Sequence, residues 1–93
     1  MPELSLDSRV VAVSTQVSTD LSGKKAILHL PTRTYYTLDG VGTTVWELLQ
    51  HETTVARIVD AMVARYDVDA ARCERDALAL LGELRANGLI EVR

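Results

Sequence analysis

The spacing of the apolar residues changes once, near Leu38, and this change limits the folds that the chain can adopt. From Val10 to Leu38, strand-forming residues follow a period of two, with Ala26, Leu28 and Leu30 on one face and Ile27 and His29 on the other. A period of two is typical of β-strands, whereas the spacing of three and four residues after Leu38 is typical of α-helices. Because strands and helices are segregated along the chain, the sequence predicts an α+β fold.

The segment before Leu38 predicts three strands, at about residues 10–14, 25–30 and 33–38. Turn-forming residues separate them, with Asp20, Ser22 and Gly23 before the second strand and Pro31 before the third. Short strands joined by short turns pair in antiparallel fashion. We therefore expect a three-stranded antiparallel sheet within residues 10–38.

Three helices are expected in residues 39–88. The expected N-caps are Asp39 for the first, Thr53 or Thr54 for the second, and Asp69 for the third. The first helix is expected to end near His51. Asn87 and Gly88 predict a left-handed end to the third helix, after which Leu89 and Ile90 fold back onto the core.

Length and composition limit the class of protein further. A chain of 93 residues is expected to form one domain, residues 1–93. It is 47% apolar and 25% charged, as in ordinary globular proteins. No run of about 18 apolar residues and no signal-peptide pattern is present, so we expect a cytoplasmic protein without a membrane partner. The net charge of -3 argues against nucleic acid as a partner.

The sequence contains no recognisable catalytic or metal-binding motif. Cys73 is the only cysteine, and neither His29 nor His51 has a second histidine at helical spacing. Gly40 and Gly42 lack the lysine and the spacing of a phosphate-binding loop. We therefore expect no enzymatic activity, no catalytic residues, no metal and no cofactor.

Two other functions stay open at this point. Three helices beside a small sheet are compatible with a winged-helix nucleic-acid-binding or regulatory domain. The third helix, however, has no net positive charge, because its three arginines are matched by three acidic residues, Glu74, Asp76 and Glu83. An enzyme subunit also stays open, since Trp46 could belong either to the core or to an interface with another protein.

The strand at residues 33–38 is the most informative segment for binding. Alternation places Tyr36 and Leu38 on one face and Arg33, Tyr35 and Thr37 on the other. If one face packs on the helices, the other exposes a tyrosine beside an arginine. This strand is either an ordinary hairpin strand or an edge strand that receives an extended peptide by β-augmentation.

Several short motifs resemble, in their order and spacing, a known family. They are residues 35–39 (YYTLD), Gly42, residues 45–49 (VWELL), a threonine-capped second helix, Asp76 before Leu80, Leu81 and Leu84, and residues 87–90 (NGLI). This pattern resembles the PqqD-like domain, the family of the peptide chaperone of pyrroloquinoline quinone biosynthesis and of the RiPP recognition elements. A chain of this length most resembles the stand-alone recognition protein of lasso-peptide biosynthesis. Asp39 stands where the family often has asparagine, which also caps helices.

The resemblance implies a winged-helix-like fold in which an N-terminal three-stranded antiparallel sheet is followed by a three-helix bundle. It also implies a non-catalytic function, the binding of a precursor-peptide leader in the cleft between the third strand and the third helix. Its implied partners are that leader, a leader protease of the cysteine-protease type and, further, the cyclase.

Carried onto this sequence, the leader-binding residues are Arg33, Thr34, Tyr35, Tyr36 and Thr37 on the strand, and Arg72, Cys73, Asp76, Ala77 and Leu80 on the helix. Tyr35 and Leu80 are expected to make apolar contacts, and Arg33 and Asp76 to fix the register. Ordinary core packing is the alternative role for Ala77 and Leu80.

Overall fold

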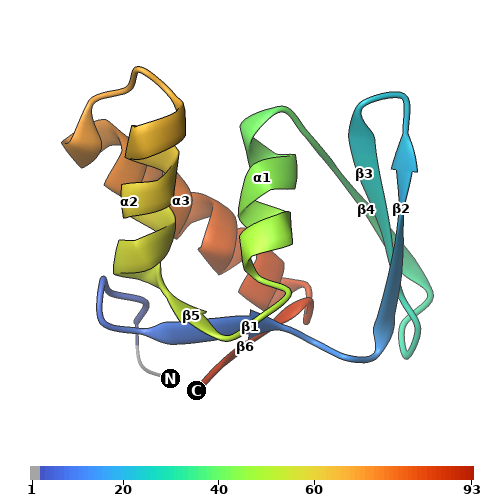
Figure 1. Ribbon diagram of the computed structural model, residues 1–93. Helices are drawn as coiled ribbons and strands as arrows, with labels where there is room; N and C mark the ends of the chain where they lie inside the picture. Colours follow the sequence, from blue (N-terminus) through green and yellow to red (C-terminus); the bar gives the residue numbers. More distant parts are fainter. Residues whose placement is uncertain (1–2) are drawn as a thin grey trace.

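Two small antiparallel sheets and three helices make up the computed structural model, which describes residues 3–93 (Figure 1). The strands are β1 (Arg9–Ala12), β2 (Gln16–Leu21), β3 (Lys24–His29), β4 (Thr34–Asp39), β5 (Thr53–Thr54) and β6 (Ile90–Val92). The helices are α1 (Val41–Leu48), α2 (Val55–Arg65) and α3 (Ala70–Ala86). Strands precede helices along most of the chain, so the predicted α+β class is confirmed.

The larger sheet has the order β2-β3-β4 and stands beside α1 (Figure 1). Its first hairpin turns through Ser22 and Gly23, which both have positive φ, 50° and 83°. This two-residue turn matches the twist of the paired strands. The second hairpin turns through residues 30–33, with Arg33 at φ 55°, so β4 begins one residue later than predicted.

The membership of this sheet differs from our prediction. The segment expected at residues 10–14 does form a strand, β1, but β1 pairs with β5 and β6 rather than with β3. Its place beside β3 is taken by β2, whose last two residues we had expected in a turn and whose other residues we had assigned to no strand. The residues of β2 after Gln16 are all exposed, so the strand has no apolar alternation from which it could be predicted.

The second sheet, β5-β1-β6, lies across one end of the three helices (Figure 1). Val10 of β1 pairs with Thr53 on one side and Val92 on the other. The strands β5 and β6 have two and three residues. Such short strands exist because tertiary packing brings them to β1, and they were not predicted.

The helix ends agree with the sequence except at α1. Thr54 accepts a hydrogen bond from the backbone N–H of Arg57 (3.2 Å), and Asp69 accepts one from that of Arg72 (3.0 Å), so both predicted caps are confirmed. The predicted left-handed end of α3 is also confirmed, since Gly88 has φ 72°.

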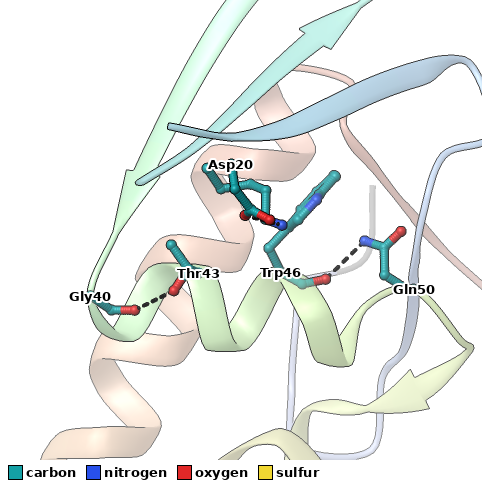
Figure 2. Close-up of polar contacts among 6 residues, drawn as sticks. Asp20, Gly40, Thr43, Trp46 and Gln50 are labelled. Carbon is teal, nitrogen blue, oxygen red and sulfur yellow. Dashed lines mark hydrogen bonds and ion pairs between the residues drawn. The ribbon is translucent and has the colours of Figure 1, made fainter. Parts of the chain in front are cut away.

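Asp39 does not cap α1, contrary to our prediction. It is the last residue of β4, and Gly40, with φ 51°, occupies the N-cap position. The Thr43 hydroxyl donates to the Gly40 carbonyl oxygen at 2.7 Å (Figure 2). Helix α1 ends at Leu48, before His51, near which we had expected the end. Beyond Leu48, the side-chain amide of Gln50 donates to the Trp46 carbonyl oxygen at 2.9 Å (Figure 2). The positive φ of Gly40 lets the chain turn directly from strand to helix. Asp39, the last residue of the strand, therefore lies one residue before the N-cap position.

The core lies where the helices meet both sheets. Trp46, Ile27 and Leu81 are among its largest fully buried side chains, so Trp46 belongs to the core. Leu89 and Ile90 are buried too, as predicted for the segment that folds back after α3. The winged-helix description fits loosely, in that three helices pack together beside a small antiparallel sheet.

Candidate functional site: a cleft between β4 and α3

A cleft of about 790 Å³ opens between β4 and α3 and extends to the start of α1 and the end of α2. Its floor is apolar, with buried Leu38 from β4, Val45 from α1, Met62 from α2 and Ala77 from α3. Each of the three helices and one strand contribute to it. The cleft is therefore a property of the whole fold, and its size suits a peptide segment or a small ligand.

One side of the cleft is the edge strand β4. Within residues 3–93, β4 pairs only with β3, so its opposite edge carries no strand. A free edge presents a row of unpaired backbone N–H and C=O groups that can bind another extended chain.

The register identifies which backbone groups of β4 are free. The Leu30 N–H donates to the Thr15 carbonyl oxygen at 3.0 Å, which makes these residues a hydrogen-bonded pair of the β2-β3 ladder. Hydrogen-bonded pairs alternate in antiparallel sheets, so Ile27 of β3 bonds to β4 instead, through its partner Tyr36. Tyr35 and Thr37 therefore direct their backbone N–H and C=O groups away from β3.

The opposite side of the cleft is one face of α3. Its lining residues recur every three or four positions, at Arg72, Cys73, Asp76, Ala77, Leu80 and Glu83. Residues at this spacing share one face of a helix. Ala77 is buried, whereas Cys73 and Leu80 are half-buried and pack against the edge of the core. The face therefore offers the apolar side chains of Cys73, Ala77 and Leu80, with charged side chains beside them, to whatever enters the cleft.

A hydrogen bond joins the two sides at one end. The Tyr36 hydroxyl donates to the Glu83 carboxylate at 2.8 Å. This bond raises the pKa of Tyr36, and its partial burial and the negative charge of Glu83 raise the pKa further. All three effects keep the phenol protonated, so it remains a donor to Glu83 at neutral pH.

The other end of the cleft is held by contacts between helices. Thr44 of α1 and Tyr66, just after α2, share a hydrogen bond of 3.0 Å between their hydroxyl oxygens. Asp69, which caps α3, also lines this end. At Gly42 a Cβ atom would lie 3.3 Å from the Leu38 side chain, so a larger residue would crowd the cleft floor.

The residues that line the cleft carry a net negative charge. Five carboxylates and one guanidinium line it, namely Asp39, Asp67, Asp69, Asp76, Glu83 and Arg72. Arg72 lies near one of them, with its Nε 3.9 Å from an oxygen of Asp76, and both side chains are largely exposed. An exposed pair of this kind contributes little to stability, so its two charges remain available to a ligand.

The structure brings together seven of the ten predicted binding residues. Tyr36, Thr37, Arg72, Cys73, Asp76, Ala77 and Leu80 all line the cleft. Thr34 lies on β4 outside the cleft lining, and Arg33 lies in the preceding turn rather than in the strand. Tyr35 points to the other face of the sheet with 70% of its surface exposed, so Tyr36 holds the place in the cleft that we expected of Tyr35.

Sequence reasoning missed the rest of the lining. These residues are Leu38, Asp39, Val41, Gly42, Val45, Met62, Tyr66, Asp67, Val68, Asp69 and Glu83. Glu83 continues the predicted α3 stripe three residues after Leu80 and could have been found from spacing. The residues of α1 and α2 could not, because only tertiary packing places them beside β4.

Other kinds of site were sought in the same part of the chain. Over residues 3–93, no group of three or more His, Cys, Asp or Glu side chains is arranged to hold a metal ion. None of the helices described has the length and hydropathy needed to cross a membrane. Burial raises the pKa of the Cys73 thiol, and the negative charge of Asp76 adds to this effect. A raised pKa is the opposite of what activates a cysteine nucleophile.

The sequence of the chain matches a known family. The sequence profile described as Coenzyme PQQ synthesis protein D (PqqD) matches residues 24–90, from the start of β3 to the start of β6. The chain belongs to the PqqD family. The predicted resemblance to PqqD-like RiPP recognition elements is thereby confirmed.

Two solved structures resemble the chain along most of its length. TbiB1 in complex with the TbiA(β) leader peptide is 37% identical, with a TM-score of 0.81 over 87% of this chain and 94% of that one. A lasso peptide synthetase B1 complexed with the leader peptide is 19% identical, with a TM-score of 0.76 over 88% of this chain and 96% of that one, which indicates a shared fold. No curated protein sequence matches the chain.

Proposed function

We propose that this protein binds the leader segment of a ribosomally synthesised precursor peptide as an additional strand on β4, against α3. The observation that carries the proposal is the free edge of β4 beside an apolar helical face. The complex of the 37% identical TbiB1 with a leader peptide supports it. The acidic lining opposes the alternative of a nucleic-acid-binding domain, because phosphates would be repelled from the cleft.

In this proposal the backbone hydrogen bonds provide affinity and the side-chain contacts provide specificity. Tyr35 and Thr37 can each donate one and accept one hydrogen bond at the free edge, at about 1 kcal/mol net for each bond. Each apolar side chain that the peptide buries against Ala77 and Leu80 adds roughly 1.5–3 kcal/mol. Because backbone pairing is nearly independent of sequence, specificity comes from the contacts in the cleft.

Ordering the peptide and losing free rotation and translation oppose binding. The ordering of a flexible segment costs roughly 2–5 kcal/mol, and association costs at least about 4 kcal/mol. With two or three buried side chains, the balance corresponds to a dissociation constant on the order of ten micromolar or weaker. Such affinity suits a carrier that releases its peptide after processing.

The protein is proposed to act without catalysis of its own. It would present the bound leader in trans to a leader protease of the cysteine-protease type and to the cyclase, in the cytoplasm. The one thiol of the cleft, that of Cys73, is not activated as a nucleophile, because its pKa is raised.

Titration of the labelled protein with leader peptides, followed by amide NMR, tests the binding. We expect the largest shifts at Tyr35 and Thr37 and along the cleft face of α3. The TbiA(β) leader serves as a first probe, with a scrambled peptide as the control. Shifts confined to other surfaces would contradict the proposal.

A matched pair of variants tests the cleft itself. Leu80→Asp puts a charge on the cleft wall and is expected to weaken leader binding at least about tenfold. Ala79→Asp adds the same charge to an exposed neighbouring position of α3 that does not line the cleft, and should bind as the wild type does. Equal affinities of the two variants would remove the cleft from the proposal, and circular dichroism checks that both are folded.

A further inference from the structure

The acidic charge of the whole protein is concentrated in the cleft. The chain has 13 acidic and 10 basic residues. Five of the acidic residues but only one of the basic ones line the cleft, which gives it a surplus of four negative charges. The rest of the protein, with eight acidic and nine basic residues, is nearly neutral. A cleft with apolar walls and charges of one sign focuses the field on whatever binds there.

Most of these carboxylates lie at one end. Asp39 ends β4, while Asp67 and Asp69 lie between α2 and α3. The hydrogen bond between Thr44 and Tyr66 ties the start of α1, just beyond Asp39, to the residue before Asp67. These carboxylates are therefore gathered where β4, α1 and α2 meet, at the end of the cleft opposite the Tyr36–Glu83 hydrogen bond.

Within residues 3–93, Asp39 and Asp67 form no close ion pair, although Lys24 lies directly opposite Asp39 in the β3–β4 ladder. Arg72 is the one cation of the lining, and its nearest carboxylate is that of Asp76. The negative charges of Asp39 and Asp67 thus remain available to a ligand.

We propose that the cleft selects an extended peptide that carries a lysine or arginine for the acidic end, spaced from apolar side chains that pack on Ala77 and Leu80. This inference rests on the proposed function and specifies the chemical class of its ligand. Alternate side chains of an added strand point into the cleft, at about 6.6–6.8 Å intervals. Tyr36 and Asp39 are three residues apart on β4, so a basic residue that also points into the cleft lies about two or four residues from the apolar ones.

A selection from a displayed library of random short peptides tests this composition directly. We expect peptides that bind the wild-type protein to be enriched in lysine or arginine at a fixed distance from an apolar residue. Enrichment in aspartate or glutamate, or no preference for charge among the selected peptides, would overturn the inference. If Leu80→Asp weakens the binding of none of the selected peptides, the result would instead contradict the leader-binding function.

Charge-matched variants then locate the contact. One selected peptide is synthesised with its basic residue kept, changed to glutamine or changed to glutamate, and titrated by calorimetry at low and high salt. For the wild type we expect glutamine to weaken binding about threefold to tenfold and glutamate to weaken it further, with smaller differences at high salt. The double variant Asp39→Asn/Asp67→Asn should lose this ranking while it still binds the glutamine peptide.

The control is Asp7→Asn/Asp60→Asn, which changes the net charge equally at exposed positions outside the cleft. It should keep the wild-type ranking. If both double variants lose it to the same extent, the preference arises from net charge rather than from the cleft, and the inference fails. Asp69 is left unchanged, because it caps α3 and its removal would perturb the fold.

Discussion

Tyr36 and Glu83, 47 residues apart in the sequence, are joined by a hydrogen bond of 2.8 Å that runs from the middle of β4 to the last part of α3. It links the edge strand directly to the helix on the opposite side of the cleft. The contact therefore ties these two elements together at this end of the cleft. The first two predictions concern its strength and its response to pH.

Removal of the Tyr36 hydroxyl should destabilise the protein modestly. We expect Tyr36→Phe to lower the free energy of unfolding by about 0.5–1.5 kcal/mol, because the hydrogen bond between a half-buried phenol and an exposed carboxylate is lost. Urea unfolding followed by circular dichroism measures the change. Tyr35→Phe is the control, since Tyr35 is largely exposed and should alter stability little. A Tyr36→Phe midpoint equal to that of the control would mean that the bond does not stabilise the fold.

The same contact predicts a loss of stability at alkaline pH. The pKa of Tyr36 is raised above its usual value of 10.0 by the hydrogen bond to Glu83, by burial and by the charge of Glu83. A raised pKa in the folded state means that the stabilisation is complete below the unfolded pKa and is lost as the pH rises through the folded one. Stability should therefore fall above about pH 10, and less steeply in Tyr36→Phe.

Ultraviolet absorbance titration follows the ionisation of the tyrosines and provides the measurement. In the wild type a late ionisation step above pH 10 is expected, and this step should be missing in Tyr36→Phe. A late step that persists in Tyr36→Phe would assign the raised pKa to another tyrosine.

Cys73 should react slowly with thiol reagents. Burial raises the pKa of its thiol, and Asp76 raises it further, so the reactive thiolate is scarce near pH 8. Asp76→Asn should increase the rate of alkylation only in part, because burial is the larger cause. Asp60→Asn changes charge elsewhere and should leave the rate unchanged. A pH-rate profile of the wild type with a midpoint at or below that of a small free thiol would contradict this prediction.

Two glycines, one within α3 and one just after it, should respond to the same substitution in opposite directions. Gly88→Ala should lower stability by about 1–2 kcal/mol, because φ is 72° and the new Cβ would lie 3.2 Å from the His29 ring. Gly82→Ala should raise stability by up to about 1 kcal/mol, because Gly82 lies within the helix and its Cβ would meet no atom within 4 Å. Thermal unfolding of both variants measures the difference, and shifts of the same sign would contradict this account.

The elements that follow from local chemistry were predictable. The strands near Ile27 and Tyr36, the caps Thr54 and Asp69 and the turn at Gly88 depend on residues close to one another in the sequence. The face of α3 that lines the cleft was also predictable, because helical spacing alone brings those residues together.

Other features depend on contacts that no local pattern contains. The strand β2 is exposed along most of its length, and β5 and β6 are too short to show a period, so their pairing is a result of tertiary packing. For the same reason β1 could be recognised as a strand but assigned to the wrong sheet. At α1, the positive φ of Gly40 takes the place that Asp39 was expected to fill.

The sequence by itself determined the α+β class and the three helices, because periodicity and capping act over a few residues, whereas the expected place of the site came from the resemblance to the PqqD-like domain. Only the tertiary structure decided which tyrosine enters the cleft, which acidic residues gather at its end and which edge of the sheet stays open. Strand pairing and the approach of α2 and α3 to β4 join residues tens of positions apart, and their free energy comes from burial that exists only once the chain has folded.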